Sequence, residues 1–213
     1  VLEVNLNAII HNINIHKSLL QPETKMMAMV KAYSYGLGGY EIAEFLQHHH
    51  IDYLGVAYAD EGIDLRKNGI TTPIMVMNPE QHSYNSIIDY NLEPEIYSFR
   101  VLDLFNEQLL HKGTQRKYPI HIKLETGMHR LGFKADELIE LKQKLNTMNV
   151  EVKSIFSHLS SADDENEKDY TMDQILTFSR NSEKLMEGLQ YRPMRHILNS
   201  SGIVNYSDFQ YDM

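Results

Sequence analysis

The sequence predicts an α/β fold built on a parallel sheet, and three observations support that class. Short apolar runs with strand character alternate with amphipathic stretches of helical spacing. This order is typical of parallel strands joined by right-handed helical crossovers. The apolar runs are almost continuously hydrophobic, which favours a sheet covered on both faces or closed into a barrel. A chain of 213 residues that is 42% hydrophobic and 23% charged suits one globular domain with a sizeable core.

Seven apolar runs are expected to be strands. They are residues 25–31, 53–58, 73–78, 94–98, 119–126, 152–158 and 194–200. Helices are expected at residues 7–20, 40–50, 60–68, 99–112, 135–148 and 170–189. A closed (β/α) barrel needs eight such units and about 250 residues, so such a barrel would here be cut just short of closure or would borrow its last piece. An open doubly wound sheet is the alternative, and the number of strands does not decide between the two.

The first residues, Val1–Leu6, also have strand character, but a helix is expected directly after them. Residues 1–6 are therefore expected to belong to a second domain that the chain lacks. Residues 7–213 are expected to form the incomplete barrel, because no linker interrupts the alternation of strands and helices.

Composition excludes several classes of protein. The formal net charge of -9 argues against nonspecific nucleic-acid binding, which needs clustered Lys and Arg. No stretch has the length and apolarity of a membrane span, and none has the pattern of a signal peptide. Cysteine is absent, so disulfides, thiolate metal sites and cysteine nucleophiles are excluded and a cytoplasmic location is favoured. No metal site is expected, because neighbouring histidines such as His48–His50 do not face one another on a helix.

Lys31 is the most informative single residue. It ends the apolar run 26–30 and begins the segment Lys31–Gly39, so it is expected at the mouth of a buried strand where the chain turns towards a helix. Desolvation there disfavours the ammonium form and yields an amine that can attack a carbonyl group. A Schiff-base lysine needs this environment. The plain alternative is a strand-end lysine whose side chain extends into water.

Polar residues follow four of the predicted strands at the point where each strand ends. Lys31 ends the first strand, Glu125–Arg130 follows the fifth, His158 ends the sixth and Asn199–Gly202 ends the seventh. Ligands bind at the carboxyl ends of the strands in parallel α/β folds. Each group also has a plain interpretation, because Arg130 could be a surface charge, His158 a core histidine and Asn199 a helix cap. The shared location favours the functional interpretation.

Together these side chains indicate one kind of chemistry. The start of a helix at Ser200–Gly202 could offer hydroxyl and N–H groups to a phosphate. The glycines of Gly36–Gly39 allow a tight turn after Lys31. Arg130 can bind a phenolate or carboxylate through two N–H groups, and His158 can stack on an aromatic ring or carry a proton. An amine, a phosphate site, a guanidinium and an imidazole together indicate a pyridoxal-phosphate pocket.

Four segments of the chain resemble sequence motifs of the alanine racemases. Residues 29–38 resemble the family's V-K-A-x-A-Y-G-H-G segment, residues 123–133 its K-x-D-T-G-M-x-R-L-G segment, residues 157–163 its H-x-x-x-A-D segment and residues 196–202 its H-x-x-N-S segment. Four motifs in the expected order over nearly the whole chain make the resemblance specific. Three substitutions depart from the pattern, namely Ser34, Leu37 and Glu125, and none of them removes the amine, the guanidinium or the hydroxyls.

The resemblance implies a TIM-type barrel of the fold-type III pyridoxal-phosphate enzymes. It implies catalytic roles for Lys31, Arg130 and His158, and cofactor contacts from Lys31, Tyr35, Arg130, His158, Asn199 and Ser200. It further implies that Arg130 binds the substrate carboxylate. Lys123 matches a lysine that is often carbamylated in the family, where the added negative charge holds the arginine in place.

The implied activity is interconversion of L-alanine and D-alanine for peptidoglycan precursor synthesis. In the family, the partner subunit of a homodimer contributes a tyrosine from a C-terminal domain, and the 213 residues contain no such domain. We therefore expect the chain alone to have little or no racemase activity. Because some bacteria join this racemase to a peptidoglycan ligase, an origin in such a fusion is a further expectation. The alternatives are a barrel protein that binds pyridoxal phosphate without racemising anything and a catalytically silent scaffold.

Overall fold

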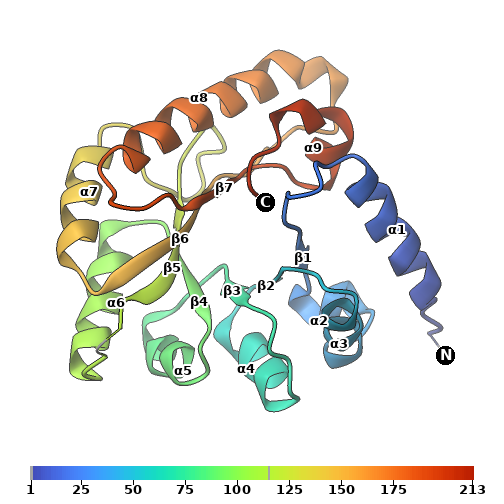
Figure 1. Cartoon of the computed structure of the whole chain (residues 1–213), viewed down its shortest axis with the longest axis horizontal. Helices are drawn as coiled ribbons and strands as arrows, with labels where there is room; N and C mark the ends of the chain where they lie inside the picture. Colours follow the sequence, from blue (N-terminus) through green and yellow to red (C-terminus); the bar gives the residue numbers. More distant parts are fainter. Residues whose placement is uncertain (1, 115) are drawn as a thin grey trace.

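A computed structural model describes residues 2–114 and 116–213, and its centre is one parallel sheet. The strands are β1 Met27–Met29, β2 Tyr53–Val56, β3 Ile74–Val76, β4 Glu93–Ile96, β5 Tyr118–Lys123, β6 Val150–Phe156 and β7 Met194–His196. Their order in the sheet is their order in the chain, and each strand pairs in parallel with the next. A doubly wound sheet would reverse its strand order at a switch point, so the sequential order excludes that alternative. Figure 1 shows the sheet curling into a partial ring with the helices outside it.

Helices connect the strands as the alternation predicts. They are α1 Leu6–Ser18, α2 Lys31–Gly36, α3 Tyr40–His48, α4 Ala59–Lys67, α5 Tyr84–Asp89, α6 Phe99–His111, α7 Leu138–Thr147, α8 Lys168–Met186 and α9 Ser200–Asn205. Six of these lie in the ranges expected, with ends displaced by a few residues, and α9 begins at Ser200 as expected. Helix α5 was not expected, because its six residues are too short to show an amphipathic period.

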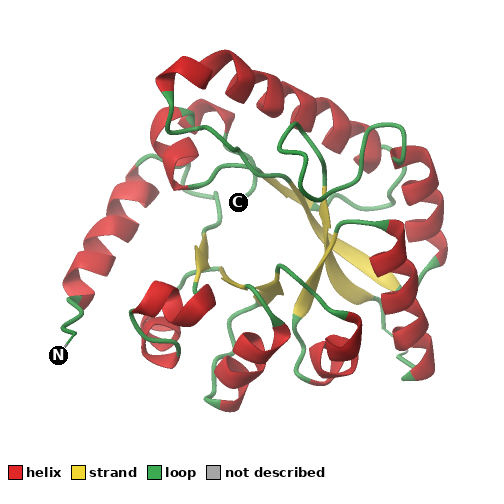
Figure 2. Cartoon of the chain, turned by 180° about the vertical axis from the view of Figure 1, so that it is seen from behind, coloured by secondary structure: helices red, strands yellow, loops and turns green. Residues whose placement is uncertain are grey.

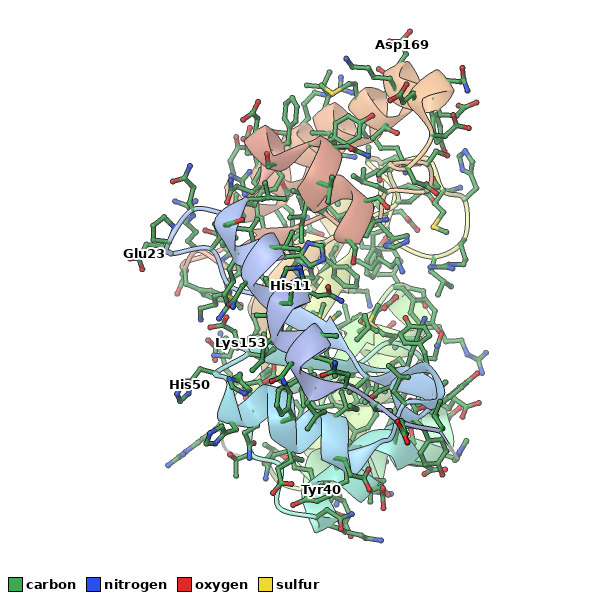
Figure 3. The ribbon with its side chains drawn as sticks, turned by 90° about the vertical axis from the view of Figure 1, so that its right-hand side faces the viewer. His11, Glu23, Tyr40, His50, Lys153 and Asp169 are labelled. Atoms are coloured by element: carbon green, nitrogen blue, oxygen red, sulfur yellow. The ribbon has the colours of Figure 1, made fainter. Side chains whose placement is uncertain are left out.

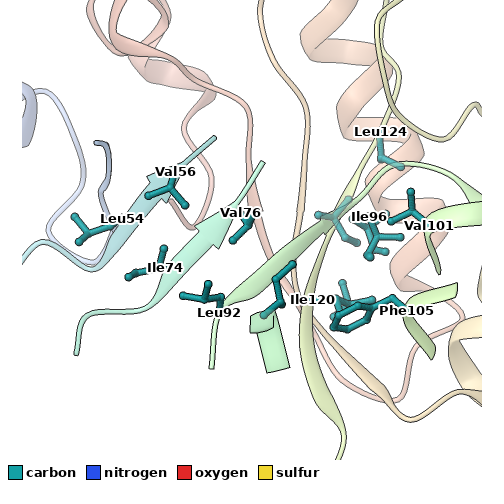
Figure 4. Close-up of a cluster of buried hydrophobic side chains, with 14 of the residues drawn as sticks. Leu54, Val56, Ile74, Val76, Leu92, Ile96, Val101, Phe105, Ile120 and Leu124 are labelled. Atoms are coloured by element: carbon teal, nitrogen blue, oxygen red, sulfur yellow. The ribbon is translucent and has the colours of Figure 1, made fainter. Parts of the chain in front are cut away.

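The main hydrophobic core lies between the outer face of the sheet and the helices. Every second residue of a strand points to this face, and Figure 4 shows the resulting cluster. On the strands Leu54, Ile74, Ile96 and Ile120 are fully buried, and Phe105 of α6 packs among them. Burial of each such side chain contributes about 1.5–3 kcal/mol, so this layer holds the helices against the sheet.

The inner face of the sheet differs from the expectation of nearly all-apolar strands. Glu95, His121, Lys123 and Ser154 are buried there on β4, β5 and β6. Their polar groups contact one another across neighbouring strands, which is how a parallel sheet can bury them. The barrel interior is therefore apolar near β1 and β2 and polar near β4 to β6.

The sheet is open between its first and last strands. Within the described residues β1 and β7 do not pair with each other. Strand β1 is half-buried and β7 is half-buried at two of its three residues, whereas β2 to β6 are mostly buried. Asp212 lies between them: its backbone N–H donates to Arg195 O at 3.0 Å, and its backbone O accepts from Lys25 N at 3.0 Å. Figure 2 shows the C-terminus in this gap. The predicted barrel without its eighth strand is confirmed.

Helix α1 covers part of the open side. In Figure 3 this helix, which carries His11, spans the molecule between the early elements around Tyr40 and the late helix that carries Asp169. Residues 2–5 form no regular element, and Val1 lies outside the described residues, so the second domain proposed for residues 1–6 stays a prediction. No helix in the described part of the chain is both long and apolar enough to cross a membrane.

Candidate active site

The predicted site residues lie at one edge of the sheet. Lys31 follows β1, Arg130 lies in the loop after β5, His158 follows β6, and Ser200 begins α9 after β7. Because all strands are parallel, these positions share the carboxyl edge of the barrel. The topology thus brings together groups that are far apart in the sequence.

The charges of other members of this group act on His158. Its side chain is half-buried, and burial lowers the pKa of the imidazole. The positive charges of Lys123, Arg130 and Lys31 lower this pKa further, in that order. Three cations from three different segments therefore act on one imidazole, which is neutral at pH 7. The mouth of the barrel carries local positive charge although the chain as a whole is acidic.

Lys31 begins an unusual turn. Residues Ala32, Tyr33, Ser34 and Tyr35 all have left-handed backbone angles, with φ between 52° and 56°. This conformation costs about 1–2 kcal/mol for each residue that is not glycine. Gly36, with φ of 87°, ends the left-handed stretch without that cost. Strain of this kind is concentrated at functional sites and persists only where the surroundings hold it.

Glu61 of α4 holds the turn in place. One carboxylate oxygen accepts from Ala32 N at 2.6 Å, and the other accepts from Ala57 N at 2.7 Å and Tyr58 N at 3.2 Å. Ser34 N also donates to Val30 O at 3.0 Å. Glu61 was not among the residues expected at the site. The available signal was its position in the first turn of a predicted helix, where a glutamate often caps the helix.

The surroundings of Lys31 are less dry than expected. Its side chain is half-buried, and its Nζ lies 5.9 Å from the ring centroid of Tyr35, which is itself exposed. The reason is the open side of the sheet, because Lys31 follows β1, the half-buried strand at that edge. Tyr35 does lie beside the lysine, as its predicted role requires.

The loop that carries Arg130 is rigid at its base although Arg130 itself is exposed. Glu125 N donates to Phe133 O at 2.9 Å, and Phe133 N donates to Lys123 O at 2.9 Å. Gly132 closes the loop with φ of 129°, and a Cβ there would lie 2.6 Å from the backbone where β5 ends. The backbone therefore fixes where the loop leaves β5 and returns to it, and only the tip is free to present the guanidinium.

Lys123 is buried behind Arg130 and does not line the open mouth. Its Nζ lies 3.2 Å from Glu95 Oε1, and the side chains are 5% and 1% exposed. Burial raises the pKa of Glu95 to about 7, although the positive charges of Lys123 and Arg130 oppose the rise. Glu95 was not expected at the site because it lies in a run that was predicted to be an apolar strand.

Asn199 and Ser200 have different roles in the structure. Asn199 Oδ1 caps α9 by accepting from Gly202 N at 2.9 Å, and its Nδ2 donates to Leu159 O at 3.1 Å. The plain interpretation of Asn199 as a helix cap is therefore correct. The Gly202 N–H was expected to be available to a phosphate, but it donates to Asn199 instead. Ser200 is exposed at the mouth, so its hydroxyl is available to a ligand.

A chain of buried polar groups lies on the inner face of the sheet. Glu93 Oε2 lies 2.9 Å from His121 Nε2, His121 Nδ1 lies 2.7 Å from Ser154 Oγ, and Ser154 Oγ lies 2.9 Å from His196 Nε2. His196 also stacks on Phe156 at 4.9 Å between ring centroids. Burial lowers the pKa of His196 to about 3, so this imidazole stays neutral. The polar residues at every second position of β4 and β5 were the signal that could have revealed this chain.

The fold and these side chains define a class: a (β/α)-barrel domain that gathers basic and polar side chains at the carboxyl ends of its strands. Residues 4–213 match the family model described as the N-terminal domain of alanine racemase. Alanine racemase 1 of Oceanobacillus iheyensis is 32% identical over 99% of this chain, and alanine racemase of Clostridium kluyveri is 35% identical over 99%. The chain therefore belongs to the alanine racemase family.

Solved structures of the family have the same fold. The alanine racemase of Clostridium difficile 630 superimposes with a TM-score of 0.92 at 30% identity, over 99% of this chain and 58% of that protein. A complex of the same protein with cycloserine gives the same agreement. The chain spans 56% and 54% of the lengths of the Oceanobacillus and Clostridium kluyveri relatives, or about half.

Proposed function

We propose that this chain is the pyridoxal-phosphate-binding barrel of an alanine racemase that interconverts L-alanine and D-alanine. The observation that carries the proposal is the placement of Lys31, Arg130, His158 and Ser200 directly after parallel strands, at one edge of the barrel. This arrangement favours a small anionic ligand. The further proposal is a cytoplasmic homodimer that supplies D-alanine for peptidoglycan precursors.

The donor set fits pyridoxal phosphate. The Lys31 amine suits the aldehyde, and the exposed hydroxyls of Tyr35 and Ser200 suit the phosphate. Arg130 suits the phenolic oxygen and a substrate carboxylate, because a guanidinium can bind either through two N–H groups. His158 can pack on the pyridine ring. When bound, the cofactor supplies the electron sink that spreads the negative charge left by removal of the α-proton.

The chain's own residues then bind, orient and move protons. Lys31 Nζ carries a proton to or from the alanine Cα on one face, as general acid or base. Arg130 holds the alanine carboxylate and so fixes which face points to Lys31. His158 covers the ring without adding charge, because burial and three neighbouring cations keep it neutral. The left-handed turn fixes the backbone from which Lys31 extends.

Racemisation needs proton transfer on both faces of Cα, and Lys31 serves only one. The resemblance to alanine racemases assigns the second face to a tyrosine of a C-terminal domain. We therefore propose that the 213 residues bind the cofactor but turn over alanine little or not at all.

Covalent trapping tests the proposal. The chain is incubated with pyridoxal phosphate, reduced with borohydride and mapped by mass spectrometry. We expect a visible absorption band before reduction and a pyridoxyl adduct on Lys31 after it. Lys31→Ala should lose both, whereas Lys17→Ala, a change of an exposed lysine on α1, should keep both.

A wild-type chain without an adduct on Lys31 would refute cofactor binding. A full-length polypeptide that traps the cofactor but does not racemise alanine would refute the proposed activity and favour a protein that only binds pyridoxal phosphate.

A further inference from the structure

Glu95 is an unusual residue in this barrel. It lies on β4 with its side chain 1% exposed, and its Oε1 is 3.2 Å from Nζ of Lys123, whose side chain is 5% exposed. The strands β4 and β5 are neighbours, and Glu95 pairs in register with His121, two residues before Lys123. Both side chains therefore point to the same inner face of the barrel.

The carboxylate has little other support. Apart from the ion pair with Lys123, neither oxygen of Glu95 has a hydrogen-bond partner among the described residues. The positive charge of Arg130 also favours its ionised form. A buried carboxylate with so few partners is costly unless nearby cations compensate it, and here two cations do so.

We propose that Glu95 is a positioning residue whose ionised carboxylate pairs with Lys123 and keeps it an unmodified ammonium. This inference refines the site of the proposed function and rests on it for the relevance of Lys123 to that site. It also replaces the expectation that Lys123 is carbamylated.

The charges involved explain why the Glu95–Lys123 ion pair and a carbamate on Lys123 exclude each other. Carbamylation needs a neutral Lys123 amine, which attacks the carbon of CO₂ and releases one proton to form an N-carboxylate. The ion pair with Glu95 engages the same Nζ and depends on the positive charge that carbamylation would remove. A carbamate on Lys123 would also place a second anion beside the Glu95 carboxylate in a buried site, where like charges disfavour each other strongly.

The geometry makes Glu95→Gln the informative variant. Glutamine keeps the size of the side chain but removes its charge, so Lys123 becomes a buried cation without a counterion. Burial then favours its neutral amine, which CO₂ can attack. A carbamate formed there would restore the missing negative charge.

The test measures carbamate directly, without cofactor or substrate. Each protein is equilibrated with ¹³C-bicarbonate at about pH 8.5, where the Glu95 carboxyl is ionised. Carbamate is then detected by ¹³C NMR. We expect no carbamate signal that depends on Lys123 in the wild type. We expect one in Glu95→Gln, lost again in the double variant with Lys123→Met.

Thermal unfolding with and without bicarbonate gives a second measurement. Because CO₂ would bind only the folded form of Glu95→Gln, bicarbonate should raise the melting temperature of that variant by several degrees. It should leave the wild type and the double variant unchanged. A residue that acts only through packing would not produce this dependence on bicarbonate.

A wild-type carbamate signal that disappears in Lys123→Met would overturn the proposal, and this arm requires no variant at Glu95 to fold. A folded Glu95→Gln protein that forms no carbamate would overturn the claim that Glu95 keeps Lys123 unmodified. Neither result depends on Lys31 or on racemase activity, so failure here is distinct from failure of the proposed function.

Discussion

Glu61 holds the strained turn beside Lys31, and Glu61→Gln tests how much that support contributes. The carboxylate accepts three backbone N–H groups: Ala57 and Tyr58 on one oxygen and Ala32 on the other. A glutamine has one acceptor oxygen, which satisfies more donors when it faces Ala57 and Tyr58. Its amide NH₂ then faces the N–H of Ala32, and two donors oppose each other.

The size of the effect follows from this geometry. A hydrogen bond to a charged group contributes about 1.5–3 kcal/mol, and the substitution removes the one to Ala32 and weakens the other two. The four left-handed residues that follow Lys31 together cost about 4–8 kcal/mol, so the turn has little reserve once its anchor is lost. We expect the free energy of unfolding to fall by about 2–4 kcal/mol. The loss of protection from amide hydrogen exchange should be greatest at the turn.

Two measurements check this prediction. Urea unfolding should show a lower midpoint with an unchanged m-value. Amide hydrogen exchange should accelerate at Ser34, whose N–H is bonded within the turn. Asp60→Asn is the matched control, because it removes a charge one residue away on the same helix without removing a hydrogen bond to the turn. Glu61→Gln with wild-type stability and wild-type exchange at Ser34 would refute the reasoning.

Three further predictions concern the loop, the buried polar chain and the helix cap. Gly132→Ala should lower the free energy of unfolding in urea by clearly more than about 1 kcal/mol, because the new Cβ would overlap the backbone of Leu124 and Glu125. Gly69→Ala is the control and should cost less, because Gly69 also has a positive φ but no atom lies within 4 Å of its new Cβ. Burial lowers the pKa of His196 from its ordinary value of about 6.5 to about 3 in the folded protein. Between these two pH values the unfolded chain binds a proton at His196 and the folded protein does not. The free energy of unfolding should therefore fall by about 1.4 kcal/mol for each pH unit as the pH falls from about 6.5 to about 3. Replacing His196 with Gln should flatten this pH dependence, and an equal slope in both proteins would contradict the assignment. Asn199→Ala should cost about 1 kcal/mol in thermal unfolding by removing the cap, whereas Ser200→Ala should be near neutral in stability and weaken phosphate binding.

The predicted fold agrees with the structure where the sequence signal was local. All seven strands lie where short apolar runs indicated, and six of the helices lie where the helical spacing of apolar residues indicated. Burial of a strand leaves an apolar run in the sequence, and burial of one helix face leaves a repeat. The motifs around Lys31 and Arg130 likewise placed the site at the carboxyl edge of the sheet. Those features depend on residues close together in the chain.

The sequence by itself determined the α/β class, the order of the strands along the chain and the candidate amine, guanidinium and imidazole. Only the tertiary structure decided that the sheet curls into an open barrel, that Lys31 is half-buried beside the gap and that Asn199 serves as a cap. It alone paired Lys123 with Glu95 and joined Glu61 to the turn after Lys31. The physical reason is that a buried charge is stable only through partners on neighbouring strands and helices, and those partners are set by register and closure rather than by local spacing.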